Sequence, residues 1–135
     1  MKHLLAIFII ILTFSANAQT GLKGTSWVMT KIVDKKAKTS LIINNEHATL
    51  RFDDTTYAGY GCNAFSGKYK ATSNKINFLG GMHITDNGCG APDDYKAENY
   101  VLQNFMQLEY KLSGETLTLN KDNEVIFTYI KQTQK

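Results

Sequence analysis

The chain has 135 residues, and its 15 Lys and Arg residues exceed its 12 Asp and Glu residues to give a formal net charge of +3. A charge this small, with lysines scattered along the chain, argues against nucleic acid or an anionic membrane surface as a partner. The length fits one globular domain, and no repeat or linker divides it.

The first residues have the pattern of a secretory signal peptide. A basic start at Lys2 precedes an apolar run over residues 4–14, and the small residues Ala16 and Ala18 form a cleavage pattern before Gln19. The apolar run is about 11 residues long, whereas a membrane span needs about 20. We therefore predict a signal peptide over residues 1–18 and one mature domain over residues 19–135, without a transmembrane segment. No cysteine lies near the cleavage site, so we expect an exported, soluble chain in the periplasm or outside the cell, not a lipid-anchored one.

Most of the mature chain has the alternation and the turn residues of short strands. The strand-like runs cover residues 27–33, 40–43, 48–52, 55–60, 67–72, 76–79, 82–85, 109–113, 116–120 and 124–130. Residues 113–115 and 121–123 are predicted hairpin turns. We expect about eight short strands, and the short connections between them favour antiparallel pairing.

One segment, residues 92–108, has the periodicity of an amphipathic helix. Its apolar stripe consists of Ala97, Val101, Phe105 and Leu108, widened by Leu102 and Met106. Pro92 suits a first helical turn, and Asp93 and Asp94 complement the helix dipole there. The predicted fold class is therefore α+β and rich in β-structure: a curved antiparallel sheet or partly open barrel with one helix packed on it.

The sequence offers no convincing catalytic or metal-binding motif. A Cys–His nucleophile lacks a local motif, and no G-x-S-x-G elbow is present. The two cysteines are 27 positions apart, and the spacings C-x-x-C and H-x₃-H do not occur. His47 and His83 are interpreted as surface residues. We therefore expect a protein that is not an enzyme and has no catalytic residues, no metal and no cofactor.

Cys62 and Cys89 are interpreted as a disulfide pair, because an exported domain with two cysteines favours pairing them. Each cysteine lies in a glycine-flanked loop. In the chain-entropy model, closing a loop of this length stabilises the fold by about 3.5 kcal/mol. The alternative is that the two cysteines are free and buried as small apolar residues.

The sequence around Cys62 and several other stretches of the chain resemble the META/HslJ domain family. The family motif G-C-N-x-[F/Y]-x-G-x-Y is similar to residues 61–69, and its fixed positions fall on Gly61, Cys62, Asn63, Phe65, Gly67 and Tyr69. Trp27, the pair Thr85 and Cys89, and the strand pair over residues 110–119 match further family elements. The resemblance covers nearly the whole mature chain and implies a β-rich envelope domain linked to heat shock and drug tolerance. It implies no catalytic residues.

Two functional hypotheses follow for this domain. The first is a non-enzymatic, stress-associated binding or interaction module in the cell envelope, monomeric, whose partner is an unidentified envelope protein. The second is a carrier of a small apolar ligand or lipid inside a β-barrel cavity. The residues expected to line such a cavity are Phe78, Ile84, Phe105, Met106 and Phe127.

Overall fold

The computed structural model describes residues 21–133. The predicted signal peptide lies outside these residues. The described part contains nine strands and one helix. They are β1 (Thr25–Asp34), β2 (Thr39–Ile42), β3 (Thr49–Phe52), β4 (Thr56–Tyr60), β5 (Ala64–Ala71), β6 (Lys75–Ile84), α1 (Pro92–Asn104), β7 (Gln107–Ser113), β8 (Thr116–Lys121) and β9 (Val125–Lys131).

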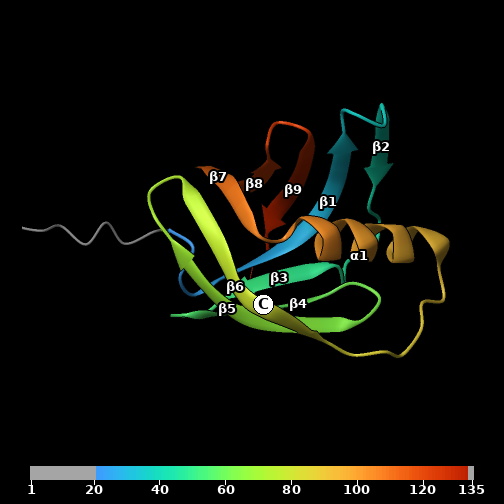
Figure 1. Ribbon diagram of the computed structural model, residues 1–135, viewed down its shortest axis with the longest axis horizontal. Helices are drawn as coiled ribbons and strands as arrows, with labels where there is room; N and C mark the ends of the chain where they lie inside the picture. The colour runs from blue at the N-terminus through green and yellow to red at the C-terminus, as the bar shows by residue number, and fades with distance from the viewer. Residues whose placement is uncertain (1–20, 134–135) are drawn as a thin grey trace, which may run out of the picture.

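The strands form a closed antiparallel barrel (Figure 1). From β3 to β9 each strand pairs with the next one along the chain, and β1 joins the two ends of this order by pairing with both β3 and β9. The short strand β2 is attached to the second half of β1, outside the ring of eight strands. The predicted β-rich fold with one helix is confirmed. We predicted a curved sheet or partly open barrel, and the pairing of β1 with β9 closes the barrel.

The alternation of apolar residues decides which side of each strand faces the interior. In β8 Leu117 and Leu119 are fully buried, and in β9 Val125, Phe127 and Tyr129 alternate in the same way. The turn between these strands has positive φ angles at two successive residues, 52° at Asp122 and 59° at Asn123. This is the backbone of a type I′ hairpin turn, whose twist matches that of the flanking strands.

Strand β6 is one long bent strand, although the sequence pattern suggested two runs separated by Gly80 and Gly81. Gly80 has a φ of +68°, which permits a sharp bend that other residues rarely adopt. Before the bend, Lys75–Asn77 pair with β7, and the described pairing to β7 goes no further. Beyond the bend β6 continues alongside β5 alone. The second half of β6 therefore separates from β7 but stays paired with β5.

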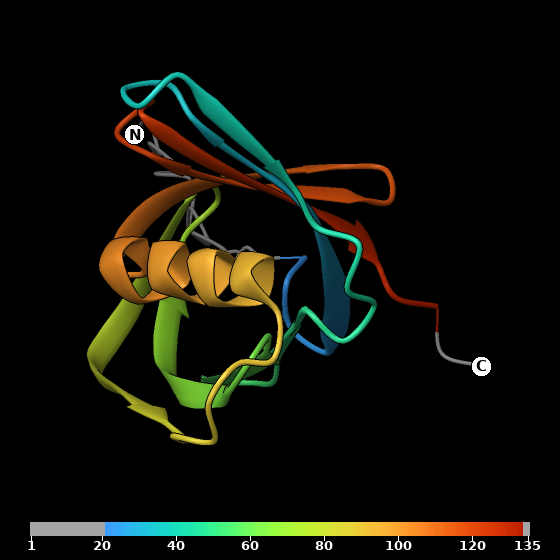
Figure 2. The same cartoon turned by 90° about the vertical axis from the view of Figure 1, so that its right-hand side faces the viewer.

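Helix α1 lies across the end of the barrel (Figure 2). It starts at Pro92 with Asp93 and Asp94 in the first turn, as predicted. It ends at Asn104, so the predicted end at Leu108 is wrong. Phe105 and Leu108 are buried and continue the apolar period, but Leu108 already belongs to β7.

The inner face of α1 is narrower than the sequence pattern indicated. Ala97 and Val101 are buried, whereas Leu102 and Met106 are exposed by 42% and 58%. The two exposed residues therefore do not widen the buried stripe. The helix packs on the barrel through Ala97, Val101 and the partly buried Tyr100, whereas Tyr95 and Leu102 remain exposed.

Aromatic rings fill the interior beneath α1. Phe105 lies directly after the helix and stacks on Phe78 with a centroid distance of 4.5 Å. It also meets Phe127 edge-on at 5.4 Å and Phe65 at 6.3 Å. Phe78 in turn contacts Tyr57 at 4.7 Å. Phe105 thus links rings from β5, β6 and β9 into one packed core.

Candidate functional site

The two cysteines meet at the end of the barrel and form a disulfide. Cys62 lies in the turn between β4 and β5, and Cys89 lies in the loop that leads into α1. Their Cα atoms are 5.1 Å apart, within the usual range for a disulfide. The predicted pairing is therefore present, and both cysteines are partly exposed.

Asn63 is buried beside this disulfide and uses all of its polar groups. Its backbone N–H donates to Glu98 Oε2 at 2.6 Å, and its Nδ2 donates to Glu98 Oε1 at 2.9 Å. Its Oδ1 accepts from the backbone N–H of Asn87 at 2.7 Å and from the hydroxyl of Thr85 at 3.3 Å. We call Cys62, Asn63, Thr85, Cys89 and Glu98 the cysteine junction.

Glu98 was not among the residues predicted from sequence. Only 7% of its surface is exposed, although it lies on a helix with polar neighbours. Both carboxylate oxygens accept hydrogen bonds from Asn63, a bidentate arrangement that compensates for the loss of water. No motif signals this role, because a glutamate in the middle of a helix normally belongs to the solvent-exposed side.

A second polar contact holds the other side of α1. The hydroxyl of Tyr100 donates to Asp34 Oδ2 at 3.0 Å, which connects the helix to the end of β1. The pKa of the Asp34 carboxyl lies below its usual value, because this group accepts hydrogen bonds from the Ala37 backbone N–H and from Tyr100. Glu98 and Tyr100 therefore anchor α1 on opposite sides.

The five residues predicted to line an apolar cavity do not line one cavity. Phe78, Phe105 and Phe127 are buried, and their rings contact one another. Ile84 and Met106 are exposed by 40% and 58%, so their assignment to the interior is wrong. Ile84 lies beyond the bend of β6, and Met106 lies beyond the end of the helix, where neither side chain can reach the core.

Exposed apolar side chains instead follow the side of α1 that carries Glu98. Tyr95 and Leu102 are three and four positions from Glu98, a spacing that places them on the same side of the helix. They are exposed by 56% and 42%, and Met106, just beyond the end of the helix, is exposed by 58%. Ile84, at the end of β6, is 40% exposed, and the next residue, Thr85, donates to Asn63. We call Ile84, Tyr95, Leu102 and Met106 the apolar flank.

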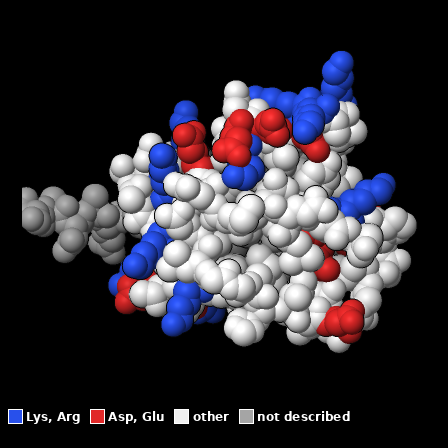
Figure 3. Space-filling model, viewed as in Figure 1, with Lys and Arg blue, Asp and Glu red and all other residues white. Residues whose placement is uncertain are grey.

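Long stretches of sequence around the apolar flank carry no charge, although Asp93, Asp94 and Lys96 lie beside Tyr95 in the first turn of α1. The sequence has no Asp, Glu, Lys or Arg between Lys75 and Asp86, and between Lys96 and Glu109 the one charged residue is the buried Glu98. Figure 3 shows an uncharged area in the middle of this face, with charged side chains around it, including some on the right, where α1 lies in Figure 1. An uncharged surface with large apolar side chains is typical of a protein-binding site.

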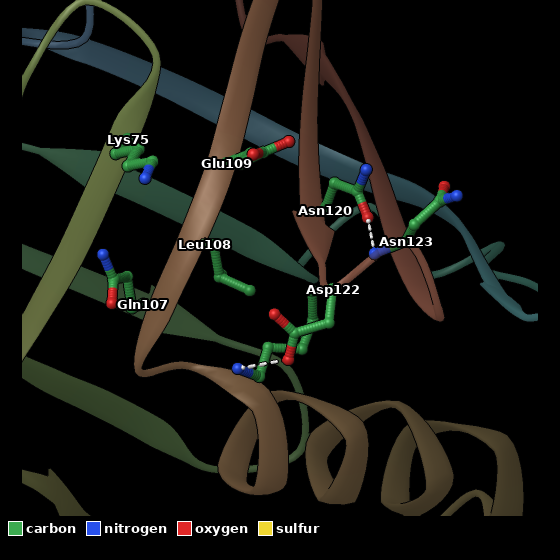
Figure 4. A pocket seen from close by; sticks show the side chains of 8 residues that line it. Lys75, Gln107, Leu108, Glu109, Asn120, Asp122 and Asn123 are labelled. Carbon is green, nitrogen blue, oxygen red and sulfur yellow. Dashed lines mark hydrogen bonds and ion pairs between the residues drawn. The ribbon is translucent and has the colours of Figure 1, made fainter.

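A separate polar cleft lies between β6, β7 and the β8–β9 turn (Figure 4). It has a volume of about 310 Å³ and is lined by Lys75, Gln107, Leu108, Glu109, Asn120, Lys121, Asp122 and Asn123. The polar groups at its edge partly satisfy one another, since Lys121 pairs with Asp122 at 2.8 Å and the Asn123 N–H donates to Asn120 at 2.9 Å. This cleft follows from the tight turn.

A family model described as the META domain matches residues 20–134, which is nearly the whole chain. The chain belongs to the META domain family. The family resemblance inferred from residues 61–69 is therefore confirmed.

Solved structures support the META fold. An NMR structure of a protein from Burkholderia xenovorans is 22% identical, with a TM-score of 0.67 over 84% of this chain and 85% of that chain. A second NMR structure is 21% identical, with a TM-score of 0.62 over 81% of this chain and 90% of that chain. The crystal structure of a DUF4847 family protein from Bacteroides vulgatus is 10% identical, with a TM-score of 0.54 over 84% and 96% of the two chains. At these identities the similarity concerns the fold.

No curated protein matches the chain. Within residues 21–133, no helix has both the length and the apolar character that a membrane crossing requires.

The META motif residues serve different structural purposes. Phe65 and Tyr69 are buried, and the Tyr69 hydroxyl donates to the Asp53 carbonyl at 2.8 Å. A Cβ at Gly67 would lie 2.8 Å from the Tyr57 hydroxyl, so this glycine leaves room for that ring. A Cβ at Gly61 would meet nothing within 4 Å. The motif therefore combines the cysteine junction with residues that pack the barrel wall.

Proposed function

We propose that this META domain is a non-enzymatic, exported binding module that recognises an envelope protein through the apolar flank. The observation that carries this proposal is the group of exposed apolar side chains on and next to α1, in a surface with few charged side chains beyond the first turn of the helix. A partner with an apolar, uncharged segment would bury these side chains without leaving a charge unpaired.

Two features support export. The sequence starts with a signal-peptide pattern, and Cys62 and Cys89 are joined in a disulfide, which persists in oxidising compartments and is rare in the cytosol. The disulfide also favours a role other than catalysis, because neither sulfur is available as a thiolate nucleophile in this form. An association with stress remains part of the proposal and rests on the family resemblance.

The carrier of an apolar ligand is the less favoured function. The rings of Phe78, Phe105 and Phe127 occupy the space that a ligand inside the barrel would need. The large apolar side chains that remain exposed include Tyr95 and Leu102 on α1 and Met106 just beyond its end, and others lie on the strands. Binding at the surface therefore uses residues that the fold leaves without a packing role.

Photo-crosslinking in the native host tests the binding surface. A benzophenone amino acid placed at Leu102 is expected to give a discrete adduct with another envelope protein, identified by mass spectrometry. The same probe at Lys111, an exposed residue of β7, is the matched control and should give no such adduct. Equal labelling from both positions, or no adduct from Leu102, would contradict the proposed binding surface.

Cell fractionation tests export separately. The chain is expected in the envelope or the medium with its N-terminus at Gln19, and alkylation without a reductant should modify neither cysteine. A cytosolic chain that retains residues 1–18 would refute export, whatever the crosslinking shows.

A further inference from the structure

Three potential metal ligands come together at the cysteine junction. The Cys62 and Cys89 sulfurs and one Glu98 carboxylate oxygen all lie within 4.8 Å of one another. They come from three separate segments: the β4–β5 turn, the loop before α1, and α1 itself. Only 7% of the Glu98 surface is exposed, and both carboxylate oxygens accept hydrogen bonds from Asn63. The carboxylate therefore points into the protein and not into solvent.

We propose that reduction of the Cys62–Cys89 disulfide converts this junction into a binding site for Zn²⁺ or a similar thiolate-preferring divalent cation. In the disulfide, the sulfurs are bonded to each other and cannot act as thiolate ligands. After reduction, two thiolates and one carboxylate provide three of the four ligands of a tetrahedral zinc site, and a water molecule completes it. Thiolate ligands favour Zn²⁺ over Mg²⁺ and Ca²⁺, which prefer oxygen.

The chemistry balances with a dithiol or a phosphine as the reductant. A dithiol gives two electrons and two protons to the disulfide and becomes a disulfide itself. A phosphine gives two electrons, takes an oxygen atom from water to become a phosphine oxide, and leaves the two protons of that water on Cys62 and Cys89. The cation then displaces one proton from each thiol.

The local backbone permits the small movement that metal binding requires. After reduction, the two sulfurs must separate from the distance of the S–S bond so that both can bind the same ion. Cys89 is flanked by Gly88, whose φ is +72°, and by Gly90, and a Cβ at either glycine would meet nothing within 4 Å. The Cys89 side of the site can therefore adjust without displacing packed side chains.

Asn63 would hold the carboxylate ligand in place. It donates to both oxygens of Glu98, and its Nδ2 also lies 3.6 Å from the Cys62 sulfur. Hydrogen bonds of this kind orient metal ligands and stabilise their negative charge. The carboxylate keeps further lone pairs for an ion, because each oxygen accepts one hydrogen bond from Asn63.

Titration with Co²⁺, a spectroscopic substitute for Zn²⁺, tests the site in the purified chain. After reduction with a phosphine, we expect one Co²⁺ to bind with the near-ultraviolet charge-transfer absorption of cobalt thiolates, and Zn²⁺ to displace it. The oxidised chain has the same sequence and should not show this absorption. Zn²⁺ should raise the melting temperature of the reduced chain and leave that of the oxidised chain unchanged.

Variants separate this site from adventitious binding to free thiols. Glu98→Gln should weaken Co²⁺ binding by about tenfold or more, as should loss of an orienting group such as Asn63. Asp86→Asn removes a negative charge from the same loop region and is the matched control, with unchanged affinity. Circular dichroism and the oxidised form of each variant show whether it is folded.

Three results would overturn the proposal. They are the absence of thiolate charge-transfer absorption in the reduced chain, equal Co²⁺ affinity in reduced Cys62→Ser, and equal affinity of the reduced chain in denaturant. The last result would mean that the thiols bind metal without the fold. The crosslinking at Leu102 is measured on the oxidised chain, so failure of the metal site does not affect the proposed function.

Discussion

At the scale of single residues, the side chain of Asn63 connects three segments of the fold. It contacts α1 through Glu98, the loop before α1 through Asn87, and the end of β6 through Thr85. Its position directly after Cys62 fixes the turn that presents the disulfide. The Asn of the family motif is therefore a structural connector between the barrel and the helix.

The Asn63–Glu98 contact should show strong energetic coupling. Asn63→Ala removes the Nδ2 donor to Glu98 Oε1 and keeps the backbone N–H that donates to Oε2, so one oxygen of a buried carboxylate loses its donor. Hydrogen bonds to charged groups contribute about 1.5–3 kcal/mol each. A double-mutant cycle of Asn63→Ala and Glu98→Ala, measured by urea unfolding, should give a coupling energy of roughly 1–3 kcal/mol. Lys96→Ala, on the exposed side of the same helix, should be additive with Asn63→Ala. Additivity between Asn63 and Glu98 would show that the contact contributes little.

Unlike the polar groups of Asn63, the buried hydroxyl of Tyr129 has no hydrogen-bond partner among the described residues. Tyr129→Phe removes an unsatisfied polar atom and should leave the free energy of unfolding unchanged or raise it by about 1 kcal/mol. Tyr69→Phe removes a hydroxyl that donates to the Asp53 carbonyl and should lower it by about 1 kcal/mol. Thermal melts of the two variants test this contrast. A larger loss for Tyr129→Phe would indicate a partner for its hydroxyl.

The same tyrosine predicts a decline in stability at high pH. Burial raises the pKa of the Tyr129 phenol above its ordinary value, so above about pH 10 the unfolded chain releases a proton that the folded chain keeps. The free energy of unfolding should then fall with rising pH, by up to about 1.4 kcal/mol per pH unit for this group. Urea midpoints between pH 8 and 11 should fall less steeply in Tyr129→Phe, and equal slopes would contradict the assignment.

Glycines in the motif region differ in how much they tolerate a side chain. A Cβ at Gly59 would overlap the Phe65 ring and lie 2.7 Å from the Thr49 carbonyl oxygen. Gly59→Ala should therefore lower the free energy of unfolding by about 1–3 kcal/mol, as overpacking does. Gly61→Ala has free space and should change it by less than about 1 kcal/mol, although Gly61 is the motif residue. Equal losses would show that the constraint is not steric.

At the scale of elements, the strands were predictable and the end of the helix was not. Leu117, Leu119 and Phe127 alternate in the sequence because each strand has one buried face, so the pattern and the structure agree. Phe105 and Leu108 continued the helical period across the boundary, because both are buried for reasons that do not depend on helical structure. The spacing of apolar residues indicates which residues are buried, and here buried residues continue beyond the end of the helix.

The candidate site shows the same limit of sequence reasoning. The pairing of Cys62 with Cys89 was predictable, since an exported chain with two cysteines has one possible intramolecular disulfide. Glu98 was not, because its burial depends on the fold bringing Asn63 to α1 from 35 positions away. Ile84 and Met106 were assigned to the interior on hydrophobicity alone, and the bend of β6 and the end of α1 place them outside.

The disulfide connects two loops, so loss of either cysteine should lower the free energy of unfolding by the same amount. Cys62→Ala and Cys89→Ala should each lower the free energy of unfolding by about 3.5 kcal/mol, the loop-closure value for this separation. The double variant should lose no more than either single variant, since each single change already breaks the bond. Denaturant titrations under non-reducing conditions measure all three, and additive losses would contradict a shared bond.

At the scale of the whole molecule, aromatic side chains pack the interior of the barrel, and the proposed binding surface lies outside it. Rings from β4, β5, β6 and β9 pack beneath Phe105, and α1 lies across this end of the barrel (Figure 2). Among the apolar side chains that this packing does not use are Tyr95 and Leu102, which are exposed on α1. Recognition of a partner protein therefore needs no opening of the barrel.

Native mass spectrometry of the chain purified from its own cell envelope, in buffer without detergent, tests this arrangement most directly. The result expected is the bare mass of residues 19–135, lower by two hydrogens because of the disulfide. A stoichiometric adduct of a lipid or another small apolar molecule would contradict it, because such a ligand requires space inside the barrel that the aromatic core occupies.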